Sequence, residues 1–183
     1  MFPYSDASVH HRTFPYVNAG LIGISVLVFL YEMALGGGGA LTGSGGLKLD
    51  LFFLKWGFIA QELTSGHPYE VLHTSFGQAD IESPVHTVFT IFSSMFIHGG
   101  FMHLAGNMMF LWVFGDNIED RLGHVKYLVF YLVAGVAATL SQWMIDSGSQ
   151  VPLIGASGAI SGVLGAYLMI YPNNKVKALI IFY

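Results

Sequence analysis

Long apolar runs, each close to the length of a membrane crossing, dominate this sequence. The first extends from Val17 to about Leu35, and its nineteen residues nearly match the ~20 that a helix needs to cross a hydrocarbon core. The apolar residues do not follow amphipathic spacing, which favours lipid over water as the solvent. The sequence therefore predicts an all-α membrane protein with four spans. The three later spans are expected from about Gly100 to Ile118, from about Lys126 to Ile145, and from near Gly155 to before Pro172.

The charge content agrees with this interpretation. Hydrophobic residues make up 54% of the 183 positions and charged residues 10%, whereas a soluble domain usually carries about 25% charged residues. The net charge of −4 comes without a basic cluster, so nucleic acid is not an expected partner. The absence of cysteine excludes disulfides, thiolate metal ligands and a cysteine nucleophile. We expect an integral, multi-pass membrane protein in contact with the lipid bilayer.

The segments outside these runs predict how the chain is divided. Residues 1–16 are polar and mixed and form an N-terminal segment, and residues 17–183 form the membrane domain. Residues 36–46 contain seven glycines and are not expected to hold a helix. They begin a long outer loop, 36–84. The last six residues, 178–183, are apolar but too few for a crossing, so they predict the start of a fifth helix in a longer chain.

Basic residues predict the orientation. With four spans, the N-terminus and the turns near residues 120 and 175 share one side of the membrane. The opposite side has basic residues only at Lys48 and Lys55, in the long loop. The positive-inside rule therefore places residues 1–16 in the cytoplasm and the start of the fourth helix toward the outer face. The five basic residues on the cytoplasmic side are Arg12, Arg121, Lys126, Lys175 and Lys177.

Ser157 begins the fourth expected helix, with Gly155 and Gly158 close by. Free backbone N–H groups at a helix N-terminus favour negative charge, so they could bind the oxyanion of a tetrahedral intermediate on this serine. The glycines would let a substrate backbone approach closely. A structural alternative remains open, because small residues recur every four positions here, as in tightly packed membrane helices. The two ladders are Ser157, Ser161, Gly165 and Gly158, Gly162, Ala166.

His103 and Asn107 favour a catalytic role for this region. They are four residues apart on the second expected helix, so they share one face, and polar groups in an apolar run need a partner or water. Both side chains can donate hydrogen bonds to an oxyanion. They could instead form a pair that only joins helices, or line the polar path of a small transporter. Because the orientation places them on the same side as Ser157, we favour one joint site.

Eight histidines raise the question of a metal site. The sequence has no H-E-x-x-H pattern, and His98 and His103 are five residues apart, which rotates them off a common helix face. We therefore expect no metal and no other cofactor.

Three motifs resemble those of the rhomboid family of intramembrane serine proteases, in the family's order and spacing. Residues 96–108 resemble its H-x(4)-H-x(3)-N segment, residues 115–123 the loop after its second helix, and residues 155–162 its G-x-S-G motif. The resemblance covers about 85–172 and points to the bacterial type. It implies a rhomboid-like helical bundle of six spans, of which this sequence holds four and the start of a fifth.

The resemblance also implies a function and a role for each residue. Ser157 is the nucleophile of a serine–histidine dyad, and His103, Asn107 and the Ser157 backbone N–H bind the oxyanion. His98 supports the outer end of the site, and Glu119 with Arg121 holds the cytoplasmic turn together. The complete enzyme would cleave single-pass transmembrane proteins near the outer face of the bacterial inner membrane.

The sequence departs from the family pattern in two places. Phe89 and Thr90 stand where the family has a tryptophan and an arginine, so no role is carried onto them. The family's general base is a histidine on its sixth helix, and no histidine follows Tyr171. We therefore expect an N-terminal portion of the protease that is inactive alone, with the base on a later helix. The alternative is a non-catalytic relative that binds transmembrane helices without cutting them.

Overall fold

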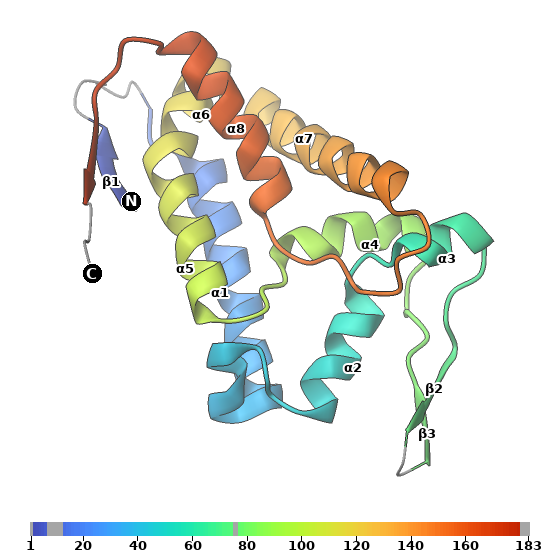
Figure 1. Cartoon of the computed structure of the whole chain (residues 1–183). Coiled ribbons are helices and arrows are strands. Elements are labelled where there is room, and N and C mark those ends of the chain that lie inside the picture. Colours follow the sequence, from blue (N-terminus) through green and yellow to red (C-terminus); the bar gives the residue numbers. More distant parts are fainter. Residues whose placement is uncertain (1, 7–12, 75–76, 180–183) are drawn as a thin grey trace.

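The computed structural model of this chain describes residues 2–6, 13–74 and 77–179, and it is mostly helical (Figure 1). Two helices in this described part are long and apolar enough to cross a membrane, or up to three if one bent pair counts as a span. Four short strands form two antiparallel pairs, so the expectation of an all-α chain is wrong in these two places.

Helix α1 (Tyr16–Gly36) forms the first predicted span and continues into the 3-10 helix η1 (Gly37–Thr42). The expectation that residues 36–46 could not hold a helix is therefore wrong for their first half. Close backbone packing explains the difference, because a Cβ added at Gly36 would lie 2.9 Å from the Cα of Gly45. The glycines let the chain fold back on itself here instead of forming an open loop.

The segment expected as an outer loop is largely structured. It contains helices α2 (Leu47–Trp56) and α3 (Ala60–Ser65) and a hairpin of strands β2 (Val71–Thr74) and β3 (Gly77–Asp80). Lys55 Nζ lies 2.9 Å from Asp80 Oδ2, which ties the hairpin to α2. The hydrogen bond from Lys55 holds the pKa of the Asp80 carboxyl below its usual value.

The second predicted span belongs to a bent unit. Helices α4 (Thr87–Ser93) and η2 (Ser94–Phe96) meet the next helix at 84°. That helix comprises α5 (Phe101–Phe110), the π-helical turn η3 (Leu111–Gly115) and α6 (Asp116–Leu122). It starts near the predicted residue 100 but ends at Leu122, four residues later than predicted. The charged segment after Gly115 is therefore helical, and the helix stops at Gly123, whose φ is +81°.

The third predicted span matches α7 (His124–Ile145), and the fourth corresponds to α8 (Ser157–Ile170). With 14 residues, α8 is about 21 Å long at 1.5 Å per residue, short of the ~30 Å hydrocarbon core. Within the described residues, two helices are long and apolar enough to span a membrane, or three if the bent pair is one span, and four spans are not shown. Helix α8 begins about midway along α1 and runs toward the end where α6 meets α7 (Figure 1).

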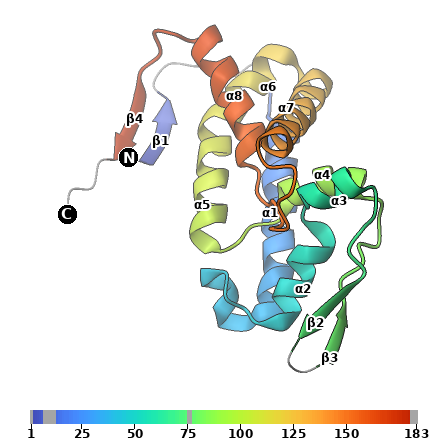
Figure 2. The same cartoon turned by 45° about the vertical axis from the view of Figure 1, so that its right-hand side comes forward.

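The predicted start of a fifth helix is wrong for the two residues of 178–183 that are described. Ala178 and Leu179 belong to strand β4 (Val176–Leu179), which pairs antiparallel with β1 (Phe2–Asp6) beside α5 (Figure 2). Residues 180–183 lie outside the described residues. Helix nucleation is unfavourable in so short a segment, whereas pairing with a distant strand satisfies its backbone groups directly.

Candidate active site

Ser157 is held in place by the backbone before it. Two hydrogen bonds between Phe58 and Leu153, of 3.1 and 2.7 Å, pair this segment with the chain that follows α2. The N–H of Gly155 then donates to the carbonyl of Ser94 at 2.8 Å. The entry to α8 is therefore attached to η2, and Ser157 is exposed at the first turn of α8.

His103 and Asn107 approach this entry from α5. A Cβ added at Gly155 would lie 2.7 Å from the Cε1 and Nε2 atoms of the His103 ring and 3.7 Å from Asn107 Nδ2. Gly155 also has a φ of +118°, a conformation that side chains with a Cβ rarely adopt. A glycine is therefore required for two reasons at the point where α5 meets the start of α8.

Asn107 presents a hydrogen-bond donor that nothing uses. Its Nδ2 atom is buried and has no hydrogen-bond partner within the described part of the chain. Leaving a buried donor unpaired costs about 1–3 kcal/mol, so an acceptor bound at this position would be stabilised. The Ser157 hydroxyl likewise makes no hydrogen bond with any described residue.

His98 lies behind His103, fully buried in the turn before α5. Its ring packs edge-on against the His103 ring, with centroids 5.2 Å apart, and its Nδ1 lies 3.1 Å from the carbonyl oxygen of Phe96. Its backbone N–H donates to Glu32 Oε1 at 3.1 Å. Sequence reasoning missed Glu32, although an acidic residue inside an apolar run is itself a signal of a functional or structural site.

The two small-residue ladders of α8 have different environments. A Cβ added at Gly158 or Gly162 would lie 2.6 or 2.5 Å from the Cβ of Ala138 or Ala134, so this ladder packs α8 against α7. Ser157, Ser161 and Gly165 are exposed, and nothing lies within 4 Å of a Cβ added at Gly165. Gly158 therefore has a packing role, whereas Ser161 and Gly165 lie on the exposed side of α8.

A cavity of about 180 Å³ borders Ser157 on the side of α7. Thr139 and Gln142 of α7 line it together with Ser94, so polar groups surround part of it. His103 and Asn107 do not line this cavity. The serine therefore lies between two environments, the cavity on one side and the α5 donors on the other.

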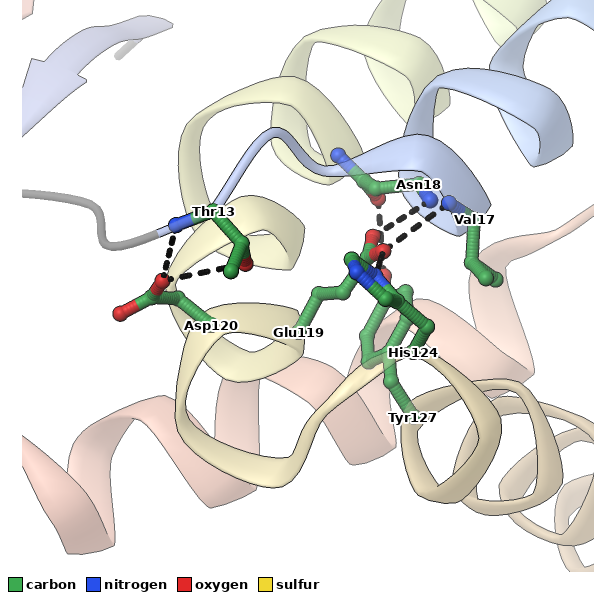
Figure 3. A network of polar contacts seen from close by, with 7 residues as sticks. All are labelled: Thr13, Val17, Asn18, Glu119, Asp120, His124 and Tyr127. Carbon is green, nitrogen blue, oxygen red and sulfur yellow. Dashed lines mark hydrogen bonds and ion pairs between the residues drawn. The ribbon is translucent and has the colours of Figure 1, made fainter.

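The prediction that Glu119 and Arg121 pair to hold the cytoplasmic turn together is wrong. Glu119 is fully buried and accepts the backbone N–H groups of Val17 and Asn18 at 2.9 and 2.7 Å, at the N-terminus of α1 (Figure 3). Arg121 is exposed, and within the described residues it forms no ion pair with Glu119. Residues two apart on a helix point to different faces, which separates the two side chains.

Glu119 belongs to a network that sequence reasoning did not identify (Figure 3). His124 Nδ1 lies 2.5 Å from Glu119 Oε1, and the Tyr127 hydroxyl donates to Asn18 Oδ1 at 2.8 Å. The Asn18 side chain also donates to the carbonyl of Leu111 at 3.0 Å. The network joins the N-terminus of α1 to η3, α6 and α7, at the end of α1 remote from η1.

Among the described residues, no group of three histidine, aspartate or glutamate side chains could hold a metal ion.

Comparison with known proteins matches the model of the rhomboid domain to residues 85–183. RHOMBOID-like protein 5 of Arabidopsis thaliana is 36% identical over 78 residues, which are 43% of this chain and 25% of that protein. Rhomboid protein 1, mitochondrial, of Saccharomyces cerevisiae is 35% identical over 91 residues, 48% of this chain and 26% of that protein. Rhomboid protease GluP of Bacillus subtilis is 38% identical over 79 residues, 43% of this chain and 15% of that protein.

The chain thus spans about a quarter or less of the length of these curated relatives. No solved structure matches it. Since the family model covers more than half of the sequence, the chain belongs to the rhomboid family, which includes intramembrane serine proteases.

Proposed function

We propose that this chain carries the nucleophile and the oxyanion-binding groups of an intramembrane serine endopeptidase. Ser157 attacks the scissile carbonyl, and His103, Asn107 and the backbone N–H of Ser157 bind the resulting oxyanion. The observation that carries the proposal is the contact of His103 with Gly155, two residues before the serine. It brings two side-chain donors and a helix N-terminus to one place, as oxyanion stabilisation requires.

The unpaired donor of Asn107 supports this assignment. A tetrahedral oxyanion would accept a hydrogen bond from the buried Nδ2 atom, which has no partner in the described residues. A donor that is satisfied only when the intermediate forms stabilises the transition state more than the ground state. Removing one such donor typically lowers kcat by a factor of roughly 10²–10³.

The general base is proposed to come from outside this segment. A serine hydroxyl needs a base to become a good nucleophile, and no histidine follows Tyr171 in the sequence. The exposed ladder of Ser157, Ser161 and Gly165 offers a face where another helix could pack closely, because small residues allow helix backbones to approach. A histidine on that helix would complete the dyad, and the segment by itself would be inactive.

The proposed substrates are single-pass transmembrane proteins, cut near the outer face of a bacterial inner membrane with the N-terminus of this chain in the cytoplasm. Hydrolysis needs water, which lipid excludes, and the polar cavity of about 180 Å³ beside Ser157 could supply it. A substrate helix must unwind locally, because helical carbonyl groups are engaged in backbone hydrogen bonds. Helix-weakening residues near the cleavage site should therefore increase the rate.

The experiment that tests the function uses the full-length gene product in liposomes with a transmembrane substrate. Ser157→Ala should abolish cleavage and labelling by a fluorophosphonate probe. Ser161→Ala is the matched control, since this serine lies one turn along the same exposed face and should leave both signals intact. Cleavage that survives Ser157→Ala would exclude this nucleophile. Helix binding without cleavage in the unmodified protein would support the non-catalytic alternative.

A further inference from the structure

An apolar groove of about 430 Å³ lies between α1, α2 and η2, with walls that do not include the candidate active site. Ile24, Leu27 and Tyr31 form its α1 wall, and Phe52 and Trp56 form its α2 wall. The hydroxyl of Ser93 in its lining is already used, since it donates to the carbonyl of Trp56 at 2.6 Å. The groove therefore suits an apolar ligand, and its volume lies within the ~300–1,000 Å³ of ordinary ligand sites.

The groove faces the region where lipid would surround the protein. Its α1 wall belongs to a candidate membrane span, and Leu27 on that wall has 67% of its surface exposed. Tyr31 packs edge-on against Phe52 with the ring centroids 5.5 Å apart, so aromatic rings from both walls meet in the part of the groove nearer to η1. Aromatic side chains concentrate at the membrane interface, whereas Ile24 lies two turns deeper along α1. A chain-like ligand would thus run from the interface toward the bilayer interior.

A positive charge stands at the interfacial end of this groove. Lys48 precedes Phe52 by one turn and Trp56 by two, so all three occupy one face of α2. Lys48 is exposed and forms no ion pair within the part of the chain that the structure describes. Lys55, the other lysine of α2, is already engaged by Asp80. The free lysine therefore complements an anionic group just outside an apolar groove.

We infer that this groove binds one acyl chain of an anionic phospholipid, with the lipid phosphate at Lys48. The inference depends on the membrane location of α1 and not on the proposed protease activity. A lipid fits better than a partner helix, because an anionic headgroup joined to an apolar chain matches an exposed lysine beside an apolar lining.

Trp56 provides a built-in reporter for the test. The protein is placed in phosphatidylcholine vesicles that contain a minor share of phosphatidylglycerol brominated on its acyl chains, because bromine quenches tryptophan fluorescence on contact. Of the three tryptophans in this sequence, one variant keeps Trp56, through Trp112→Phe and Trp143→Phe. The matched control keeps Trp112, through Trp56→Phe and Trp143→Phe; Trp112 is 65% exposed on η3 and does not line the groove.

Brominated phosphatidylglycerol should quench Trp56 more strongly than brominated phosphatidylcholine at the same share, whereas Trp112 should respond equally to both. Lys48→Gln should weaken this preference about fivefold, the effect of one lysine at an anionic lipid, and Lys48→Arg should restore it. Lys126→Gln, a charge loss at the start of α7, should change nothing. Ile24→Phe, which fills the groove, should reduce Trp56 quenching by either lipid.

Three results would overturn the inference. The first is equal quenching of Trp56 by the two lipids, and the second is a preference that Lys48→Gln leaves unchanged. The third is a dimer in native mass spectrometry that Ile24→Phe dissociates, because the groove would then hold a second copy of the chain. Since Lys48 is exposed, its substitution should leave the fold intact, and the helical circular dichroism signal checks this.

Discussion

The carboxylate of Glu32 accepts the backbone N–H of His98 at 3.1 Å, and both side chains are at most 1% exposed. This contact joins α1 to the turn before α5, across 66 residues of sequence. Because the His98 ring packs against His103, helix α1 contributes to the position of the residues proposed to bind the oxyanion. A buried acid in the first helix thus supports a site formed by the second and fourth predicted spans.

Glu32→Ala should destabilise the protein by about 1–3 kcal/mol, because it leaves the buried N–H of His98 without an acceptor. Glu32→Gln keeps an acceptor oxygen and should therefore lose much less stability than Glu32→Ala. Denaturant titration in detergent micelles measures the free energy of unfolding of both variants. Equal losses for the two would show that the hydrogen bond is not what makes Glu32 important.

Glu119→Ala should lower the free energy of unfolding by roughly 3–5 kcal/mol, because it removes a buried partner of the α1 N-terminus and of His124. Arg121→Ala is the control and should change stability by no more than about 0.5 kcal/mol, since Arg121 is exposed. The same unfolding measurement applies. A large loss for Arg121→Ala would restore the Glu119–Arg121 pair expected from the sequence.

Gly155→Ala should reduce proteolysis by the full-length protein strongly. The added Cβ would lie 2.7 Å from the His103 ring, and the backbone φ of +118° disfavours alanine. Gly20→Ala on the exposed side of α1, with nothing within 4 Å of the new Cβ, should leave the rate unchanged. Rates of transmembrane substrate cleavage in liposomes distinguish the two, and wild-type activity in Gly155→Ala would contradict the geometry of the site.

Gly162→Ala should loosen the contact between α7 and α8, because its Cβ would lie 2.5 Å from the Cβ of Ala134. Overpacking of this kind costs typically about 1–3 kcal/mol. Adding Ala134→Gly removes the opposing Cβ and should recover much of the loss. A double-mutant cycle on unfolding free energies tests this. Purely additive effects would mean that the two residues do not limit how closely the helices approach.

Several features were predictable because they depend on neighbouring residues. The length and hydropathy of the apolar runs predicted α1 and α7 almost to the residue, since a helix that buries its backbone in lipid needs only its own sequence to satisfy its hydrogen bonds. The four-residue spacing of His103 and Asn107 likewise placed both on one face of α5. The packing of η1 could not be predicted in this way, because it depends on the close approach of Gly36 and Gly45.

The sequence by itself determined that this is a membrane protein of the rhomboid type, with serine, histidine and asparagine candidates for a site. Only the tertiary structure decided the partners of the buried acids and of the last strand. Glu119 faces the N-terminus of α1 and not Arg121, Glu32 faces His98, and β4 pairs with β1. Such contacts join residues far apart in sequence, and an unpaired polar group in an apolar environment takes whichever partner the packed helices bring to it.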